Sequence, residues 1–277
     1  MDTLGRVRCA ILGSRGLVAQ RLLQILTNHH WLVPTHVVGS KESAGIRTND
    51  IPWVFNESKP DLPEIIVREM GSGDELASEL ISQGVRIVFS ALPDYPASVI
   101  EEDLARSGLV VISHSTIHRH SNKVPLVIPE VNPHHLDLLG VQTEFGQGAL
   151  VSCSNCMVVP LAISLAPILK KFPVKSIRID TEQSISGAGR GALERFREGV
   201  IPGPEIIGEP ESVVSELRRI LEIHEGSESH NIDIEITAEC ERVHREFGHS
   251  ARVEVELSKN FSAHELIEAW SHFQSTA

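Results

Sequence analysis

The feature that most constrains the fold is a short apolar run followed by a glycine turn and an amphipathic segment. Residues 7–12 (VRCAIL) predict a strand, and the turn after it contains Gly13 and Gly16 in a G-x-x-G spacing. Apolar residues then recur at helical intervals over residues 17–26. This order is typical of dinucleotide-binding α/β domains, in which the glycines admit a pyrophosphate to the helix N-terminus. The alternative is a tight turn that binds no nucleotide.

The next strand region, residues 35–45 (THVVGSKESAG), bears on which dinucleotide would bind. NAD sites usually end the second strand with an acidic residue that binds the ribose 2′-OH. Ser40, Lys41 and Ser43 occupy that region here. A lysine and two hydroxyl groups suit a 2′-phosphate, so the sequence favours NADP over NAD. An ordinary polar loop is the alternative.

Two further β-rich runs, residues 85–92 and 109–113, flank a segment of helical periodicity that ends at Gly108. Alternation of strand and helix at this spacing predicts a parallel, doubly wound sheet, and hence an α/β fold of the Rossmann type. We expect an NADP-binding domain over residues 1–152 and an α/β catalytic and dimerisation domain over residues 153–277.

Composition excludes several classes of protein. Lys plus Arg number 25 and Asp plus Glu 37, so the net charge of −12 argues against nucleic-acid binding or anionic membranes. No apolar stretch approaches the roughly 18 residues of a membrane span, and the N-terminus does not resemble a signal peptide. The four cysteines do not have the regular spacing of a disulfide framework, so they fit a reducing compartment and predict a cytoplasmic protein.

The stretch SCSNCMVVP (152–160) contains Cys153 and Cys156. An apolar helical pattern continues from Val158, so Cys156 is expected at or just before a helix N-terminus, where the helix dipole favours a thiolate. A redox-active C-x-x-C pair normally starts the helix after the first strand of a small βαβ domain, whereas this pair occurs about 150 residues into the chain. A zinc site needs about four ligands with paired spacing. We expect no metal. Two structural cysteines in the core are an equal alternative to a catalytic thiol.

Polar residues downstream suit thiol chemistry on a charged substrate. Gln183 and the turn SGAG (186–189) follow a predicted strand, and Arg242 and His249 lie on the connector between two alternating strands. Histidine can shuttle protons, and arginine can bind a carboxylate through two hydrogen bonds. An ordinary surface histidine is the alternative.

Together these segments resemble the aspartate-semialdehyde dehydrogenases, specifically the archaeal and fungal-type branch shared with malonyl-CoA reductase. The resemblance rests on the order and spacing of several blocks, which are ILGSRGLVAQRLLQIL, GSKESAG, SALP, VPLVIPEVNPHHLDLL, NCMVVPLAISLAPI, TEQSISGAGR and RVHREFGHS.

The resemblance implies an NADP-dependent oxidoreductase that interconverts aspartyl phosphate and aspartate semialdehyde through a cysteine thioester. By this resemblance Cys156 is the nucleophile, His249 the acid/base and Gln183 the residue that orients the acyl group. It assigns substrate binding to Arg242, Arg119, Asn155 and Glu209. The expected partners are the small acyl substrate and phosphate, within a homodimer or homotetramer. The residues expected to contact NADP are Gly13, Ser14, Arg15, Gly16, Leu17, Val18, Ser40, Lys41, Ser43, Ser186 and Gly187.

The sequence departs from the family pattern at particular positions. Met157 stands where the family has Ser or Thr, Ser212 where it has an anion-binding lysine, and His114 where the branch has Asn. The resemblance also ends before the family's last long helix, so we expect a C-terminally shortened second domain. These differences keep two alternatives open: a reductase of malonyl-CoA or another small carboxylated acyl donor, and a non-catalytic nucleotide-binding homologue.

Overall fold

The computed structural model describes residues 5–225, 228–230 and 234–273. Its internal contacts divide the chain into two compact units. Unit 1 comprises Met1–Pro125 and Leu136–Cys153, and unit 2 comprises Leu126–His135 and Ser154–Ala277. The assignment of a nucleotide-binding domain to residues 1–152 and a catalytic domain to residues 153–277 stays a prediction.

Unit 1 is built on a parallel sheet whose strands follow the order β3-β2-β1-β4-β5-β7. Its strands are β1 (Val7–Leu12), β2 (Leu32–Gly39), β3 (Arg68–Glu69), β4 (Val85–Ser90), β5 (Val110–Ser113) and β7 (Ala149–Cys153). The order runs outward in both directions from β1, which is the doubly wound arrangement. The predicted parallel sheet is therefore confirmed.

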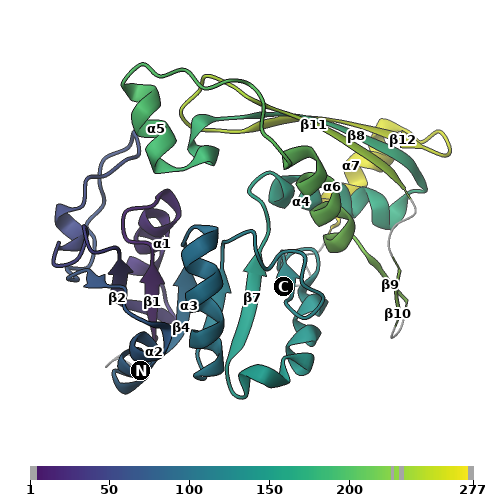
Figure 1. Cartoon of the computed structure of the whole chain (residues 1–277). Helices are drawn as coiled ribbons and strands as arrows, with labels where there is room; N and C mark the ends of the chain where they lie inside the picture. The colour runs from purple at the N-terminus through teal and green to yellow at the C-terminus, as the bar shows by residue number, and fades with distance from the viewer. Residues whose placement is uncertain (1–4, 226–227, 231–233, 274–277) are drawn as a thin grey trace. The chain divides into compact units, whose positions relative to one another are not determined.

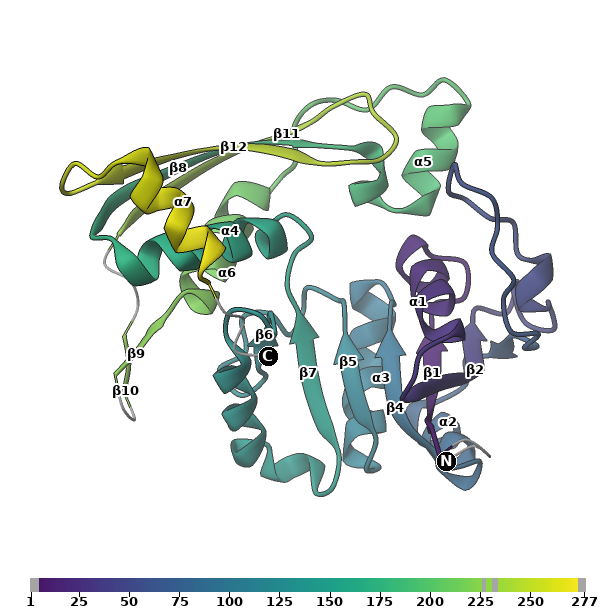
Figure 2. The same ribbon diagram turned by 180° about the vertical axis from the view of Figure 1, so that it is seen from behind.

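Helices cover both faces of this sheet. Helix α1 (Leu17–Thr27) packs through Leu23 on Ile11 and its neighbours, whereas α2 (Gly73–Ser82) and α3 (Asp94–Arg106) pack on the opposite face around Leu12. Helix α3 lies in front of the strands in Figure 1 and behind them in Figure 2. Because both faces are covered, the central strands β1, β4 and β5 consist mostly of apolar residues.

Unit 2 contains a three-stranded sheet in the order β11-β8-β12, in which β11 is parallel and β12 antiparallel to the central strand. Figures 1 and 2 show helices α4, α6 and α7 on the same side of this sheet. Alternate residues of β8, such as Ile177 and Ile179, are buried there. The elements are β8 (Val174–Gln183), β11 (Glu235–Arg242), β12 (Ser250–Leu257), α4 (Val158–Lys171), α5 (Arg190–Arg197), α6 (Glu209–Ile220) and α7 (Ala263–Ser271).

Short elements complete the chain. Strand β6 (Leu126–Val127) belongs to unit 2, as does the antiparallel pair β9 (Ile223–Glu225) and β10 (Glu228–His230). Segments of 3₁₀-helix occur at Thr48–Asp50, Pro133–Val141, Thr143–Phe145 and Ile185–Ala188. In the part of the chain that the structure describes, no helix has both the length and the apolar character needed to cross a membrane.

The strand predicted over residues 35–45 differs in its bounds. Strand β2 begins at Leu32 and ends at Gly39, and residues 41–45 form turns. The strand continues back through Pro34, beside which the register with β1 shifts between Cys9 and Ala10. Proline lacks the amide that a regular ladder needs, and this irregularity accommodates it.

Gly148 permits the closest backbone approach in unit 1 and provides a test of the packing of α3. A Cβ at this residue would lie 1.9 Å from the carbonyl oxygen of Ala105. We expect Gly148→Ala to lower the free energy of unfolding by about 1–3 kcal/mol, because backbone must shift to admit the methyl group. Gly140→Ala is the matched control, since nothing lies within 4 Å of its Cβ position. Urea denaturation measures both variants, and equal stability would contradict this account.

Candidate active site

The candidate nucleophile lies in the connection between β7 and α4. Cys156 is exposed and precedes the first residue of α4 by two positions, which confirms the predicted placement just before a helix N-terminus. The amides of Val158 and Val159 donate to the carbonyl of Asn155 at 3.0 and 3.2 Å. The side-chain oxygen of Asn155 accepts the amide of Met157 at 2.8 Å. These bonds hold the backbone on both sides of Cys156.

Cys156 and His249 form a thiol–imidazole pair. The sulfur lies 3.4 Å from Nε2 of His249, the residue directly before β12. The other ring nitrogen, Nδ1, accepts the backbone N–H of Ser184 at 3.0 Å. Burial lowers the pKa of His249, and the charge of Arg242 lowers it further. The sequence placed these two residues 93 positions apart, and the fold brings them into contact.

Arg242 is the last residue of β11 and pairs in register with Gln183, the last residue of β8. Its Nη1 donates to the carbonyl of Ser184 at 2.8 Å. Gly187 lies against this guanidinium: a Cβ there would be 2.8 Å from Arg242 Nη1 and 3.2 Å from Cε1 of His249. The absence of a side chain at Gly187 therefore leaves room for both groups beside Cys156.

One carboxylate joins two of the predicted site residues. Oε1 of Glu209 accepts Nε2 of Gln183 at 2.7 Å and Nδ2 of Asn155 at 3.0 Å. Glu209 is the first residue of α6, which follows Gly208 in the left-handed conformation. Both carboxamides are almost fully buried. Their orientation is thus determined by a charged acceptor, which makes stronger hydrogen bonds than a neutral one.

A second carboxylate of α6, which sequence analysis did not single out, holds the same loop. Glu216 is fully buried and accepts the hydroxyl of Ser154 at 2.8 Å and the amide of Asn155 at 2.7 Å. Ser212 donates to its other oxygen at 3.1 Å. The only sequence signal was the spacing of Glu209, Ser212 and Glu216, which places all three on one helix face.

The predicted nucleotide turn lies in unit 1. Gly13 has φ of +96°, and a Cβ there would lie 2.6 Å from the carbonyl oxygen of Ala91. The amide of Gly16 donates to the carbonyl of Gly13 at 3.0 Å, and α1 starts directly afterwards without a side-chain cap. Arg15 lies within this turn, and Leu17 and Val18 are the first two residues of α1. The arrangement presents a helix N-terminus in the way that a pyrophosphate requires.

The residues after β2 differ in how far they can reach a ligand. Ser40 and Lys41 are exposed, whereas Ser43 is buried and its hydroxyl donates to the carbonyl of Ser40 at 3.0 Å. Ser14 is also buried, 3.1 Å from the Ser43 hydroxyl. A hydrogen bond from Ser40 lowers the pKa of Glu42, and the charges of Lys41 and Arg15 contribute in the same direction. Two cations therefore gather at this exposed corner.

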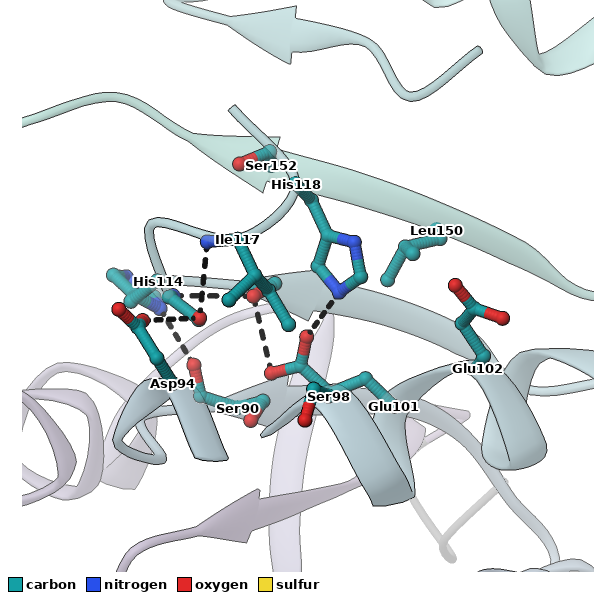
Figure 3. A network of polar contacts seen from close by, with 12 residues as sticks. Ser90, Asp94, Ser98, Glu101, Glu102, His114, Ile117, His118, Leu150 and Ser152 are labelled. Carbon is teal, nitrogen blue, oxygen red and sulfur yellow. Dashed lines mark hydrogen bonds and ion pairs between the residues drawn. The ribbon is translucent and has the colours of Figure 1, made fainter. Parts of the chain in front are cut away.

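Arg119 is also in unit 1, in a loop that is hydrogen-bonded to side chains of α3. In Figure 3, the buried Glu101 of α3 points toward His118, with 2.9 Å between its Oε2 and Nε2. The other oxygen of Glu101 accepts the Ser113 hydroxyl at 3.0 Å. Asp94, at the start of α3, accepts the Ser115 hydroxyl at 2.6 Å. Arg119 is mostly buried and donates from Nη2 to the carbonyl of His114 at 3.1 Å.

The structure therefore brings most of the predicted catalytic and substrate-binding residues together within unit 2. These are Cys156, His249, Gln183, Arg242, Asn155 and Glu209, with Ser186 and Gly187 in the adjoining turn. Arg119 and the nucleotide-turn residues belong to unit 1. Within the described ranges, no group of three or more His, Cys, Asp or Glu side chains is placed to hold a metal ion.

Fold and site together define a class: a Rossmann-type oxidoreductase with a cysteine–histidine pair in a second α/β unit. The family described as semialdehyde dehydrogenase, NAD binding domain, matches residues 8–139. Aspartate-semialdehyde dehydrogenase of Archaeoglobus fulgidus is 33% identical over 270 residues, which cover 96% of this chain and 76% of that protein. The chain belongs to the aspartate-semialdehyde dehydrogenase family.

Two further relatives show the breadth of the similarity. The NADP-dependent malonyl-CoA reductase of Metallosphaera sedula is 30% identical over 275 residues, 97% of this chain and 74% of that protein. The crystal structure of aspartate-semialdehyde dehydrogenase with NADP from Candida albicans superposes with a TM-score of 0.77 and 26% identity, and covers 98% of this chain and 77% of that one. The similarity therefore extends over both units.

The four cysteines are expected to differ sharply in reactivity. Burial raises the pKa of the Cys153 thiol to about 11 and that of Cys9 to about 12, and it also raises the pKa of Cys240. At pH 7 a thiol of pKa about 11 is ionised in about one molecule in 10⁴. We therefore expect iodoacetamide at pH 7 to modify Cys156 first.

Mass spectrometry of the alkylated protein and its peptides measures this selectivity. The first adduct should be absent in Cys156→Ala and retained in Cys153→Ala. Labelling of Cys153 at the same rate as Cys156 would contradict the assignment of Cys156 as the reactive thiol.

Proposed function

We propose that this protein is an NADP-dependent aldehyde dehydrogenase of the phosphorylating type, which interconverts aspartyl phosphate and aspartate semialdehyde. The single observation that carries the proposal is the 3.4 Å contact between Cys156 and His249, flanked by Arg242, in a member of this family. A decayed homologue would have no reason to keep this contact together with two carboxamides held by Glu209.

Cys156 is the nucleophile in this proposal. Its sulfur attacks the acyl carbon, the bond from that carbon to the phosphate oxygen breaks, and phosphate leaves with the electron pair. The product is a thioester on Cys156, which accepts hydride more readily than a carboxylate does. Expulsion of the thiolate after hydride addition releases the aldehyde.

Arg242 is placed to bind the substrate carboxylate. Nη1 donates to the Ser184 carbonyl, and a guanidinium has five N–H donors, so others can bind an anion. Gln183 and Asn155 orient the acyl group, and Glu209 keeps both carboxamides in place. Arg119 is the anion contact for the leaving group.

The residues of unit 1 fit a bound dinucleotide. A side chain at Gly13 would collide with the Ala91 carbonyl, so the tight turn between β1 and α1 requires glycine at this position, as the turn of a dinucleotide-binding domain does. The turn from Gly13 to Val18 would hold the pyrophosphate, and Ser40, Lys41 and Arg15 the 2′-phosphate. When bound, the cofactor supplies hydride to the acyl carbon or accepts it in the reverse direction.

A second activity is favoured by one position on α6. Ser212 stands where the family pattern has an anion-binding lysine, and its hydroxyl is bonded to the buried Glu216. A neutral residue here favours an acyl donor other than a phosphate, such as malonyl-CoA or another small carboxylated thioester. The malonyl-CoA reductase among the relatives supports this alternative.

We also propose a homodimer or homotetramer that works in the cytoplasm on small-molecule substrates. Cys9, Cys153 and Cys240 are free thiols, which supports a reducing compartment. The net charge of −12 argues against a nucleic-acid partner.

The decisive assay follows NADPH absorbance after the protein is mixed with NADP⁺, aspartate semialdehyde and phosphate. We expect phosphate-dependent NADPH formation that falls at least about 10³-fold in Cys156→Ala, because no other group can form the thioester. Cys153→Ser is the matched control for loss of a thiol. Turnover with malonyl-CoA and NADPH alone would favour the second activity, and no turnover with either donor by a folded, NADP-binding protein would refute both.

Cofactor preference tests the assignment of Lys41. Loss of a cation from a charge-assisted hydrogen bond costs about 1.5–3 kcal/mol, so Lys41→Ala should lower kcat/KM for NADP by about 10- to 150-fold. The value for NAD, which has no 2′-phosphate, should change little. Steady-state kinetics with both cofactors measures the ratio, and an equal loss with NAD would remove Lys41 from the 2′-phosphate site.

A further inference from the structure

Helix α3 carries a fully buried carboxylate, Glu101, that the proposed reaction does not use. It lies in the middle of the buried face of the helix, whose other members are Ala97, Ile100, Leu104 and Ala105. Burial of a carboxylate costs several kcal/mol unless it is compensated, and an apolar residue of similar size is often as stabilising as a buried charged pair. The presence of Glu101 on this apolar face therefore indicates a role other than stability.

Both oxygens of Glu101 bind the segment that ends β5 and follows it. Oε1 accepts the hydroxyl of Ser113, the last residue of β5, at 3.0 Å, and Oε2 lies 2.9 Å from Nε2 of His118. Figure 3 shows the Glu101 carboxylate and the His118 ring facing each other. Because a carboxylate only accepts hydrogen bonds, Nε2 of His118 is the donor. The His118 side chain is only 8% exposed, so both members of the pair are inside the protein.

A second carboxylate of α3 holds the middle of the same loop. Oδ1 of Asp94 accepts the Ser115 hydroxyl at 2.6 Å and the Thr116 amide at 3.0 Å, and Oδ2 accepts the Thr116 hydroxyl at 2.6 Å. Burial raises the pKa of Asp94, but these hydrogen bonds and the charge of Arg119 together lower it. The loop is thus attached to one helix along its length from residue 113 to residue 118.

Arg119 directly follows the anchored residues. Its amide donates to the carbonyl of Thr116 at 3.1 Å, and its Nη2 donates to the carbonyl of His114 at 3.1 Å. Arg119 is itself mostly buried. Backbone groups of the loop therefore determine where the guanidinium lies, and the loop in turn takes its position from α3.

The loop lies at the carboxyl edge of the parallel sheet. Ser113 of β5 pairs with Ser152 of the neighbouring strand β7, and doubly wound proteins bind ligands at this edge. Burial raises the pKa of the Cys153 thiol, the last residue of β7, and the positive charge of Arg119 opposes that rise. Arg119 therefore directs its charge to the end of the strand after which the chain continues to Cys156.

We propose that Glu101 and His118 are positioning residues for the leaving group, and that their buried pair holds Arg119 in the orientation in which its guanidinium binds phosphate. The inference rests on the proposed dehydrogenase function, in which Arg119 contacts that anion. A guanidinium binds a phosphate through parallel hydrogen bonds, so the contact depends on orientation as well as on charge. Glu101 and His118 act through Arg119 and do not touch the substrate.

His118→Ala removes the donor to Glu101 and tests the proposal by steady-state kinetics with NADP⁺, aspartate semialdehyde and phosphate. We expect the KM for phosphate to rise about 10- to 100-fold, since a misplacement of about 1 Å can cost about 100-fold. The kcat and the KM for aspartate semialdehyde should change little. His120→Ala is the matched control, because His120 is exposed in the same loop. A loss of kcat with an unchanged KM for phosphate would indicate a purely structural role and would overturn the proposal.

His118→Gln separates the hydrogen bond from the imidazole ring, because glutamine also carries an N–H donor. We expect its KM for phosphate to lie closer to the wild-type value than that of His118→Ala. A glutamine variant as impaired as the alanine variant would show that the bond to Glu101 does not hold Arg119.

A double-mutant cycle with Arg119→Ala tests the route of the effect. If His118 acts through Arg119, the loss of kcat/KM for phosphate in the double variant should equal that of Arg119→Ala alone, because residues that share one interaction are not additive. Additive losses would mean that His118 acts on the reaction by another route, which contradicts the proposal.

Calorimetric titration with inorganic phosphate needs no turnover and separates this inference from the proposed function. The dissociation constant for phosphate should rise in His118→Ala by the same factor as the KM and stay unchanged in His120→Ala. If His118→Ala does not fold, Glu101→Gln takes its place, since a carboxamide keeps the size of the side chain and accepts through one atom only. Absence of phosphate binding by the wild type would overturn the inference. Phosphate binding that depends on His118, without turnover, would refute only the dehydrogenase activity.

Discussion

The hydrogen bonds to the buried carboxylate of Glu216 are the interaction on which the rest of the site depends. Burial of an unpaired carboxylate costs several kcal/mol, so Glu216 stays inside the protein only if its oxygens are satisfied. The Ser154 hydroxyl and the Asn155 amide provide two of the donors. These are the two residues before Cys156. The hydrogen bonds that stabilise the buried Glu216 carboxylate therefore also determine where the nucleophile lies.

Glu209, two helical turns earlier on α6, extends this hold to the side chains around the thiol. It fixes the carboxamides of Asn155 and Gln183, and the end of β8 then presents the Ser184 amide to His249. The site is thus supported by a helix and a strand and not by loops alone, which is the condition for a well-defined geometry. Unit 1 uses the same device, since Asp94 and Glu101 of α3 hold the loop that contains Arg119.

Much of this could be predicted from local sequence. The glycine turn, the parallel sheet of unit 1 and the position of Cys156 before α4 follow from hydrophobic period and from glycine spacing, which act over a few residues. The end of β2 was harder to predict. Residues 40–43 look uniformly polar, yet Ser43 turns inward to bond with Ser40 and Ser14, whereas Ser40, Lys41 and Glu42 are exposed. A polar side chain can be exposed to water, but polarity alone does not indicate which side chains of a turn point inward.

By itself, the sequence determined the class of fold, the order of its elements and the kinds of side chain available for chemistry, because each of these depends on neighbours along the chain. Only the tertiary structure decided which nitrogen of His249 faces Cys156 and which carboxylate holds the nucleophile loop. Those contacts join residues 93, 65 and 61 positions apart. Their geometry is set by the packing of α4 and α6 and by the register of β8 with β11 and β12, and no local pattern encodes it.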